Sequence, residues 1–399
     1  AHASTMQADA PYSGGPGTIY AETAADTPQE GWLILKGNGV MPDSAWRYGN
    51  PFTKDYTSLH FARITLTNTV YLTVEPGRTL DLRGTEVVAA PSSQVNGIYM
   101  AGGDLVLDPV DQPISSYLKI ANGYELDTAK LTIGANGNLW YLTTPAPFGG
   151  DIEVAAGGTL TIAKTLTVDG SMAVNAGGLI QTTGPYAAPS IALDLHVKGD
   201  MSIAEGGTVS ATGSGYSGGN GPAPGGVNCG ASHGGWGRDG AGTCTLEPYG
   251  SIYNPVTHGA ATGGSGAGGG VILLVVEGML TNNGSIESCG TTGSYHYGGA
   301  GGSVNITAGS LAGAATGVIK ADAHPVHCSA CEKGPSGGGR IAVTLTDAAA
   351  DFAPYLGKIT AFGARINTTT RSGGAGTIYL RTAAQQLDEG TLIIDNADD

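Results

Sequence analysis

Apolar residues alternate with threonine and other polar residues over short stretches along most of the chain. The clearest segments are 64–67, 70–74, 79–82, 105–107, 131–133 and 139–142. Alternation with a period of two is typical of a β-strand with one buried face. Helical periodicity is weak throughout, and only residues 346–356 have a pattern compatible with a short helix. The pattern predicts an all-β chain of short strands.

Glycine turns come directly before several of these strands. Ala155–Leu160, Asn175–Ile180 and Ala204–Val209 share one turn motif at spacings of 20 and 29 residues, and Glu75–Leu80 is similar. A meander of hairpins would instead need two-residue Asn-Gly or Asp-Gly loops, which are sparse here. Recurrent turns between short strands predict the stacked coils of a right-handed parallel β-helix, or β-solenoid, with long glycine-rich loops.

A longer repeat occupies the C-terminal part of the chain. A glycine precedes a strand-like segment at positions 270, 302, 339 and 376, so the separations are 32, 37 and 37 residues. Each repeat also contains a second glycine-led segment. These second segments begin at Gly284, Gly317, Gly357 and Gly390. The pattern predicts two strands in each long coil.

These repeats define the expected organisation. Residues 13–399 are predicted to form a single β-solenoid after a flexible lead or inter-subunit segment at 1–12. Within the solenoid we expect a short-coil part at 58–212, a glycine-rich loop insertion at 213–267 and long-coil repeats at 268–396.

One segment occurs at both ends. Ser13–Ile34 and Ser372–Ile393 align without a gap at an offset of 359 residues and share SGGxGTIY, TAA, Glu-Gly and Leu-Ile. The first coil is therefore expected to resemble the last, so that the chain could continue its own stack in another copy, as a covalent array or a fibre. The residues predicted to mediate this self-association are Ser13, Gly17, Ile19, Tyr20, Ser372, Gly376, Ile378 and Tyr379.

Composition narrows the function classes. The chain has 68 glycines without a Gly-X-Y period, 41% hydrophobic residues, 13% charged residues and a net charge of −15. A chain this acidic would repel nucleic acid and anionic membranes. No apolar run approaches the ~18 residues that a membrane span needs. The acidic, Lys-poor, Ser/Thr/Gly-rich composition predicts an extracellular or cell-surface protein.

The cysteines and histidines leave several alternatives open. Cys229, Cys244, Cys289, Cys328 and Cys331 are candidates for disulfides, and their odd number leaves one free or paired between chains. His324, His327, Cys328 and Cys331 have zinc-like spacing, but the chain has no second CxxC motif. Calcium would suit an acidic exported rod, although no calcium-loop motif is present. No cofactor is therefore predicted, with zinc and calcium as the candidate ions.

A polysaccharide lyase or glycoside hydrolase is an alternative, because β-helices host such enzymes. A lyase needs a base and a cationic group beside its substrate, and the candidates are His296, Tyr297, Lys333 and Arg340. Arg340, however, occupies a strand start held by Val271, Ser303 and Thr377 in its sister repeats, and positive charge is scarce. The balance favours a protein that is not an enzyme.

The glycine-rich motifs resemble those of a known group of proteins. Ser232-His-Gly-Gly235, Tyr249-Gly-Ser251, Gly263–Gly266 and the SGGxGTIYL segment resemble the glycine-rich β-helical repeats of very large bacterial and protist surface proteins. The resemblance covers roughly residues 213–396 and the first segment, and it implies an extracellular repeat protein without defined catalytic residues. We therefore expect a structural or adhesive surface protein with itself and cell-surface glycans as partners; a glycan-binding module is a further alternative.

Overall fold

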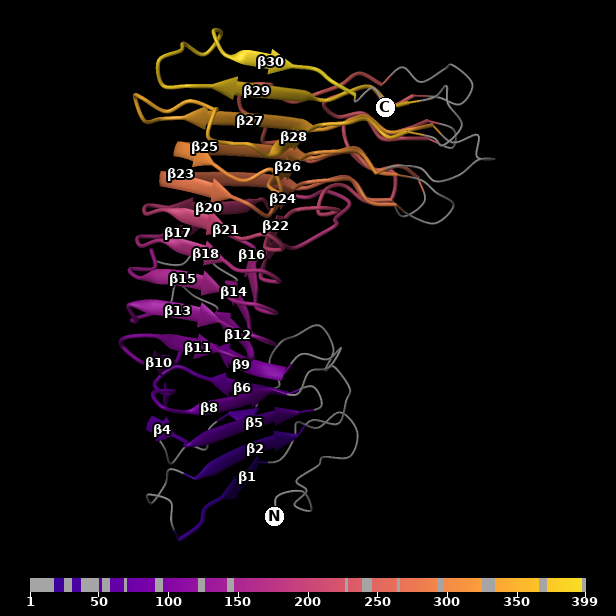
Figure 1. Ribbon diagram of the computed structural model, residues 1–399. Helices are drawn as coiled ribbons and strands as arrows, with labels where there is room; N and C mark the ends of the chain where they lie inside the picture. The colour runs from indigo at the N-terminus through magenta and orange to yellow at the C-terminus, as the bar shows by residue number, and fades with distance from the viewer. Residues whose placement is uncertain are drawn as a thin grey trace. The chain divides into compact units, whose positions relative to one another are not determined.

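The computed structural model describes residues 18–24, 31–36, 50–51, 58–67, 70–89, 96–120, 126–141, 147–226, 229–238, 246–263, 266–292, 298–324, 334–365 and 372–396. These residues form thirty strands and no helix, and most strand pairs are parallel (Figure 1). The prediction of an all-β chain is confirmed. Residues 346–356 form turns, one of them closed by the Ala350 N–H on the Asp347 carbonyl (3.0 Å), so the expectation of a short helix there is wrong.

The chain divides into two compact units, Ala1–Thr161 and Ile162–Asp399. In the N-terminal unit one sheet has the order β1 (Thr18–Ala21), β2 (Trp32–Lys36), β5 (Arg63–Thr67), β8 (Glu86–Ala89), and another has the order β10 (Asp104–Val106), β7 (Thr79–Asp81), β4 (Ser58–His60). Two further orders are β11 (Gln112–Ile114), β13 (Lys130–Ile133), β15 (Asp151–Val154), and β3 (Asn50–Pro51), β6 (Val70–Val74), β9 (Asn96–Met100), β12 (Tyr117–Ile120), β14 (Asn138–Tyr141), β16 (Thr159–Ile162).

The C-terminal unit has two main strand orders. The first is β18 (Met172–Val174), β21 (Met201–Ile203), β23 (Val271–Asn282), β25 (Ser303–Ala312), β27 (Arg340–Leu345), β29 (Thr377–Arg381), β30 (Thr391–Ile393). In addition, β17 (Leu166–Val168) pairs with β20 (Leu193–Val197), which pairs with the first part of β23. The second order is β19 (Leu179–Thr182), β22 (Thr208–Ser210), β24 (Ser285–Glu287), β26 (Val318–Lys320), β28 (Lys358–Thr360).

The core of the C-terminal unit consists of aliphatic side chains in register from strand to strand. Leu195, Leu274, Ile306 and Val343 are direct neighbours on β20, β23, β25 and β27, and each is fully buried. Because side chains alternate between the two faces of a strand, in-register parallel pairing places the same core position of every strand in one row. The alternating pattern in the sequence is therefore the pattern of this core.

Glycine turns set the spacing between strands. Gly77, Gly157, Gly177 and Gly206, one from each predicted turn motif, have positive φ values of 75°, 75°, 79° and 82°. Such angles are accessible to glycine at little cost. The predicted turns are confirmed.

The long repeats also appear where predicted. The strands β23, β25, β27 and β29 begin directly after glycines 270, 302, 339 and 376, and they pair parallel and in register. The second segments form β24, β26 and β28, but the fourth, β30, pairs antiparallel with β29 instead of joining their sheet. The turn before β30 is held by Gln385, whose side chain accepts from the Thr382 N–H (2.9 Å) and donates to the Glu389 carbonyl (3.0 Å).

The described residues of the glycine-rich segment between Gly213 and Gly270 are packed, although none of them belongs to a named strand. Its backbone bonds in several directions to other glycine segments. The hydrogen bonds run from Gly301 to Gly337 (3.1 Å), from Gly337 to Ala231 (2.9 Å), from Gly235 to Gly338 (2.9 Å) and from Gly338 to Gly374 (3.0 Å). Such close approach leaves no space for side chains, since a Cβ on Gly339 would lie 2.1 Å from the Gly302 carbonyl oxygen. We call this assembly of the described residues within 213–270 (213–226, 229–238, 246–263 and 266–270), together with 298–302, 334–339 and 372–376, the glycine bundle.

Replacing Gly339 with alanine should destabilise the C-terminal unit by about 2 kcal/mol or more, because the new methyl group would collide with backbone that cannot move aside. Gly263→Ala is the matched control: no heavy atom lies within 4 Å of its Cβ position. That change should alter stability by no more than about 0.5 kcal/mol. Chemical denaturation of both variants measures the difference, and equal stabilities would contradict the proposed packing.

Candidate functional site

The duplicated segments at the two ends form the same antiparallel hairpin. In β1 and β2, Ile19 pairs with Ile34 and Tyr20 with Leu33. In β29 and β30, the residues 359 positions later pair in the same way, as Ile378 with Ile393 and Tyr379 with Leu392. The sequence repeat is therefore a structural repeat. We call the two copies the first and the last hairpin.

Both hairpins contain the same contact between a tyrosine and a glycine. The Gly31 N–H donates to the Tyr20 hydroxyl (2.9 Å), and the equivalent Gly390 N–H donates to the Tyr379 hydroxyl (3.2 Å). A Cβ on either glycine would lie within 3 Å of the tyrosine ring, at 2.9 Å for Gly31 and 2.4 Å for Gly390. The shared Glu-Gly pair thus provides both a donor and the space for the ring.

The two hairpins join their units by opposite arms. The first hairpin uses its second arm, because β2 pairs parallel with β5 and β1 lies at the edge. The last hairpin uses its first arm, because β29 pairs parallel with β27 and β30 lies at the edge. Among the strands that the structure describes, each hairpin therefore has one arm at the edge of its sheet, and the counterpart hairpin uses that same arm for pairing.

Side-chain exposure follows from this difference. Leu392 of the last hairpin is 46% exposed, whereas the equivalent Leu33 of the first hairpin is 4% exposed. Tyr20 of the first hairpin is 43% exposed, whereas Tyr379 is 2% exposed. Exposed apolar groups on an open strand edge are a template for pairing with another chain.

The predicted self-association residues lie in two environments. Ile19, Tyr20, Ile378 and Tyr379 belong to the hairpins, and Ser13 and Gly17 lie outside the described residues. Gly376 instead belongs to the glycine bundle, where its Cβ would lie 1.9 Å from the Gly339 carbonyl oxygen, and Ser372 forms an isolated bridge with Arg365. Of the described members, Ile19 and Tyr20 lie on the edge strand β1, whereas Ile378 and Tyr379 lie on β29, which pairs with both β27 and β30.

Arg340, a candidate catalytic residue, is buried between β27 and the glycine bundle. Its Nε donates to the Tyr249 carbonyl (2.7 Å) and its Nη1 to the Thr377 hydroxyl (3.0 Å). Arg340 is 7% exposed. Its guanidinium therefore connects a loop of the glycine bundle to the sheet through buried hydrogen bonds. The other candidates, His296, Tyr297 and Lys333, lie outside the described residues.

His233 lies beside this arginine and is fully buried, a role that the sequence did not reveal. Its Nδ1 is 2.7 Å from the Gly301 carbonyl oxygen and its Nε2 is 2.8 Å from the Thr257 hydroxyl. Since a carbonyl only accepts, the proton lies on Nδ1 and Nε2 accepts from Thr257. Burial lowers the pKa of His233 to about 3, so the ring is neutral at ordinary pH. The available signal was its place in Ser232-His-Gly-Gly235, directly before two glycines of the glycine-rich segment.

The structure describes two of the five cysteines, one disulfide-bonded and one free. Cys229 is disulfide-bonded, while Cys244, Cys328 and Cys331 lie outside the described residues. Cys289 is free, and burial raises the pKa of its thiol to about 12, so it stays protonated and unreactive.

The structure describes only one of the four candidate metal ligands. Of the four, only His324 is described, and it is half-buried beside the glycine bundle, where its N–H donates to the Gly299 carbonyl (3.4 Å). His327, Cys328 and Cys331 lie outside the described residues. Among those that are described, no group of three or more His, Cys, Asp or Glu side chains is placed to hold a metal ion.

Lys119 is the most unusual ionisable residue of the N-terminal unit. It is 1% exposed, and its ammonium group lies 4.8 Å from the Trp140 ring centroid and 5.9 Å from that of Tyr99. Both rings are direct neighbours of Lys119 across the strands. Burial lowers the pKa of Lys119 to about 8. Sequence analysis missed this row, although spacings of 20 and 21 residues match the coil period.

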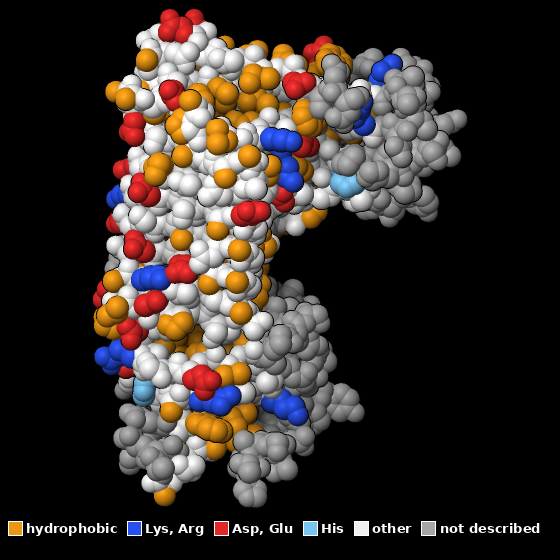
Figure 2. All heavy atoms as spheres, viewed as in Figure 1, with side chains coloured by type: hydrophobic (Ala, Val, Ile, Leu, Met, Phe, Trp, Pro, Cys, Tyr) orange, Lys and Arg blue, Asp and Glu red, His pale blue; other side chains and the backbone are white. Residues whose placement is uncertain are grey.

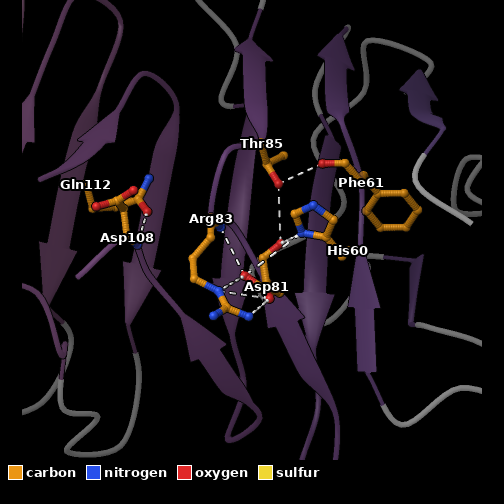
Figure 3. Close-up of polar contacts among 7 residues, drawn as sticks. All are labelled: His60, Phe61, Asp81, Arg83, Thr85, Asp108 and Gln112. Carbon is orange, nitrogen blue, oxygen red and sulfur yellow. Dashed lines mark hydrogen bonds and ion pairs between the residues drawn. The ribbon is translucent and has the colours of Figure 1, made fainter. Parts of the chain in front are cut away.

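A second polar group in the N-terminal unit is a turn rather than a site (Figure 3). Arg83 forms an ion pair with Asp81 (2.5 Å), and its hydrogen bond lowers the pKa of that carboxyl group. Thr85 closes the turn by donating to the Phe61 carbonyl (2.7 Å), and His60 Nδ1 lies 3.2 Å from the Asp81 carbonyl oxygen. These contacts hold the backbone of the turn in place.

On the face of the molecule shown in Figure 2, acidic and basic side chains are interspersed.

The C-terminal unit should lose stability in acid because of His233. His233 binds a proton near pH 6.5 in the unfolded chain but only near pH 3 in the folded chain. Stability should therefore fall by about 1.4 kcal/mol per pH unit between these values. Urea unfolding at pH 7 and pH 5 should show a smaller loss for His233→Gln. His196→Gln, at a partly exposed histidine beside Glu277, should keep the loss that His233 causes. Identical pH dependence in both variants would contradict this assignment.

Lys119 should have an effect of the same sign in a higher pH range, because burial lowers its pKa as well. As pH rises from about 8 to 10.5, the folded chain gives up the buried proton before the unfolded chain does, so the stability of the N-terminal unit should rise. Lys119→Met should remove this rise. Lys130→Met should retain it, because Lys130 is paired with Glu153 at 2.6 Å near the surface. Unfolding followed by tryptophan fluorescence at pH 8 and pH 10 measures the difference.

The chain matches no known protein family, no curated protein and no solved structure. Within the described part of the chain, no helix has the length and apolar character needed to cross a membrane.

Proposed function

We propose that the chain is an extracellular structural or adhesive surface protein, built as a right-handed parallel β-helix and assembled end to end. The observation that carries this proposal is the recurrence of one hairpin at both ends, each copy with a different open edge. A globular enzyme has no need for matched apolar edges at its two ends. A repeating assembly does, because every internal edge must be paired.

The architecture and the chemistry of the chain support this proposal. Parallel pairing in register, stacked aliphatic rows and glycine turns between short strands are the features of a β-solenoid. The disulfide at Cys229 suits an oxidising compartment outside the cytosol. A net charge of −15 keeps such a protein soluble and away from anionic surfaces.

Glycan binding is a second candidate, supported by aromatic residues on the C-terminal unit. Trp236 is 48% and Tyr253 38% exposed, and Tyr253 packs edge-on against Tyr379 with ring centroids 5.0 Å apart. Exposed aromatic rings held by their neighbours can stack on sugars. Titration with neutral and acidic oligosaccharides should quench Trp236 fluorescence if this surface binds glycans. Trp236→Ala should then lose the response and Trp32→Ala should keep it.

The polysaccharide lyase alternative has less support. The guanidinium of Arg340 is buried and donates hydrogen bonds to Tyr249 and Thr377. A carboxylate substrate would have to replace these hydrogen bonds. Release of unsaturated sugars from acidic glycans by the full chain would favour that alternative over a structural role.

Association of the full chain tests the proposed function. Sedimentation and electron microscopy at increasing concentration should show higher-order particles or filaments. Leu392→Asp should weaken association because it places a charge on the open edge of β30. Leu387→Asp is the matched control: that residue is 53% exposed in the turn of the same hairpin and away from the edge. A chain that stays monomeric at every concentration, and is recovered from the cytosol of its source cells, would contradict the proposal.

A further inference from the structure

We propose that a single hairpin forms the junction between two successive copies of this chain. Its first arm pairs with the last coil of one copy and its second arm with the first coil of the next. This inference rests on the proposed end-to-end assembly and names the strands that meet. The partner is a second copy of this sequence, and the strand that covers the open edge of β30 is the equivalent of β5.

The chain already contains both kinds of strand pairing that the junction needs. The last hairpin demonstrates how the first arm joins a preceding strand, since Ile378 on β29 pairs with Ile341 on β27. The first hairpin demonstrates how the second arm joins a following strand, since Leu33 on β2 pairs with Ile64 on β5. Because the two hairpins have the same sequence motif and internal register, one hairpin can make both sets of contacts at once.

The two faces of the hairpin support this double role. Adjacent residues of a strand point to opposite faces. Ile378 faces the core of its unit, where its neighbour Ile341 is fully buried. Leu33 also faces a core, beside the buried Ile64, yet its equivalent Leu392 lies on the hairpin face opposite to Ile378. One face therefore suits the core of the preceding copy and the other face suits the core of the next copy.

The last hairpin has exposed apolar side chains at the positions that would contact the next copy. Leu392 and Ile394 are 46% and 65% exposed, while their equivalents Leu33 and Leu35 are 4% and 0% exposed against β5. The register of β2 and β5 transfers directly to the junction. It pairs Thr391 with Arg63, Leu392 with Ile64, Ile393 with Thr65 and Ile394 with Leu66 of the next copy.

The junction determines the geometry of the assembly. Since the two arms are antiparallel, the strands of successive copies run in opposite directions, and their cores lie on opposite faces of the shared hairpin. The repeating unit is 359 residues, the offset between the two hairpins. In separate chains the edge of β5 is already occupied by β2, so one hairpin must be displaced. A continuous chain needs no displacement, because it has one hairpin at each junction.

A fused chain tests the junction directly. Residues 1–394 are followed by residues 36–399, so that one hairpin lies between two copies. Cysteine is placed at position 392 of the first copy by Leu392→Cys, and its modification by a maleimide is followed by peptide mass spectrometry. Relative to the same substitution in the 399-residue chain, the modification should slow by about tenfold or more, because thiol reactivity depends on access.

Thr391→Cys is the matched control. Its equivalent, Trp32, remains 42% exposed beside β5, so this thiol should react at the same rate in both proteins. Unchanged reactivity of Leu392→Cys in a fused chain whose Thr391→Cys control behaves as expected would overturn the shared hairpin. Slowing at both positions would also overturn it, since that result indicates burial unrelated to the β5 register. Neither result depends on cellular location or glycan binding, so failure of the junction is distinguishable from failure of the proposed function.

Discussion

Each extended segment of this protein has to pair its backbone N–H and C=O groups with the segments stacked on either side of it. In the strands this requirement is met by parallel ladders in register, and the register then aligns the buried residues Leu274, Ile306 and Val343 in one row. An unpaired buried backbone group costs as much as a lost hydrogen bond. Strand pairing therefore determines which residues are in the core. A strand at the edge of a sheet differs, because one side of its backbone has no neighbouring strand.

The glycine bundle meets the same requirement in a different way. Gly337 and Gly338 exchange hydrogen bonds with three separate segments. Bonding in so many directions brings backbones within a distance that excludes a Cβ, as at Gly234, where a Cβ would lie 2.0 Å from the Gly339 carbonyl oxygen. The high glycine content is thus a packing requirement. The few larger residues beside the bundle, His233, Tyr249 and Arg340, provide the hydrogen bonds and contacts that glycine cannot.

The ends of the stack carry the functional proposal because an edge strand cannot satisfy its own backbone. Both ends are finished by an antiparallel hairpin, and in each the inner arm is paired while the outer arm presents apolar residues such as Tyr20 or Leu392. An ordinary monomer protects such edges with charges, proline or a covering loop. The proposal that a second copy completes the hairpin rests on the paired counterpart that each outer arm has in the other hairpin.

The all-β class, the strand starts after glycines 270, 302, 339 and 376, and the equivalence of the two hairpins are predictable from the sequence, because they depend on local periodicity and turn chemistry. The tertiary structure was needed to find that β30 turns back on β29, that the hairpins join by opposite arms, and that His233, Arg340 and Lys119 are buried. The reason is physical. A strand pattern specifies which residues share a face, but it does not specify which neighbouring backbone completes the ladder, and burial of a polar side chain depends on segments distant in sequence.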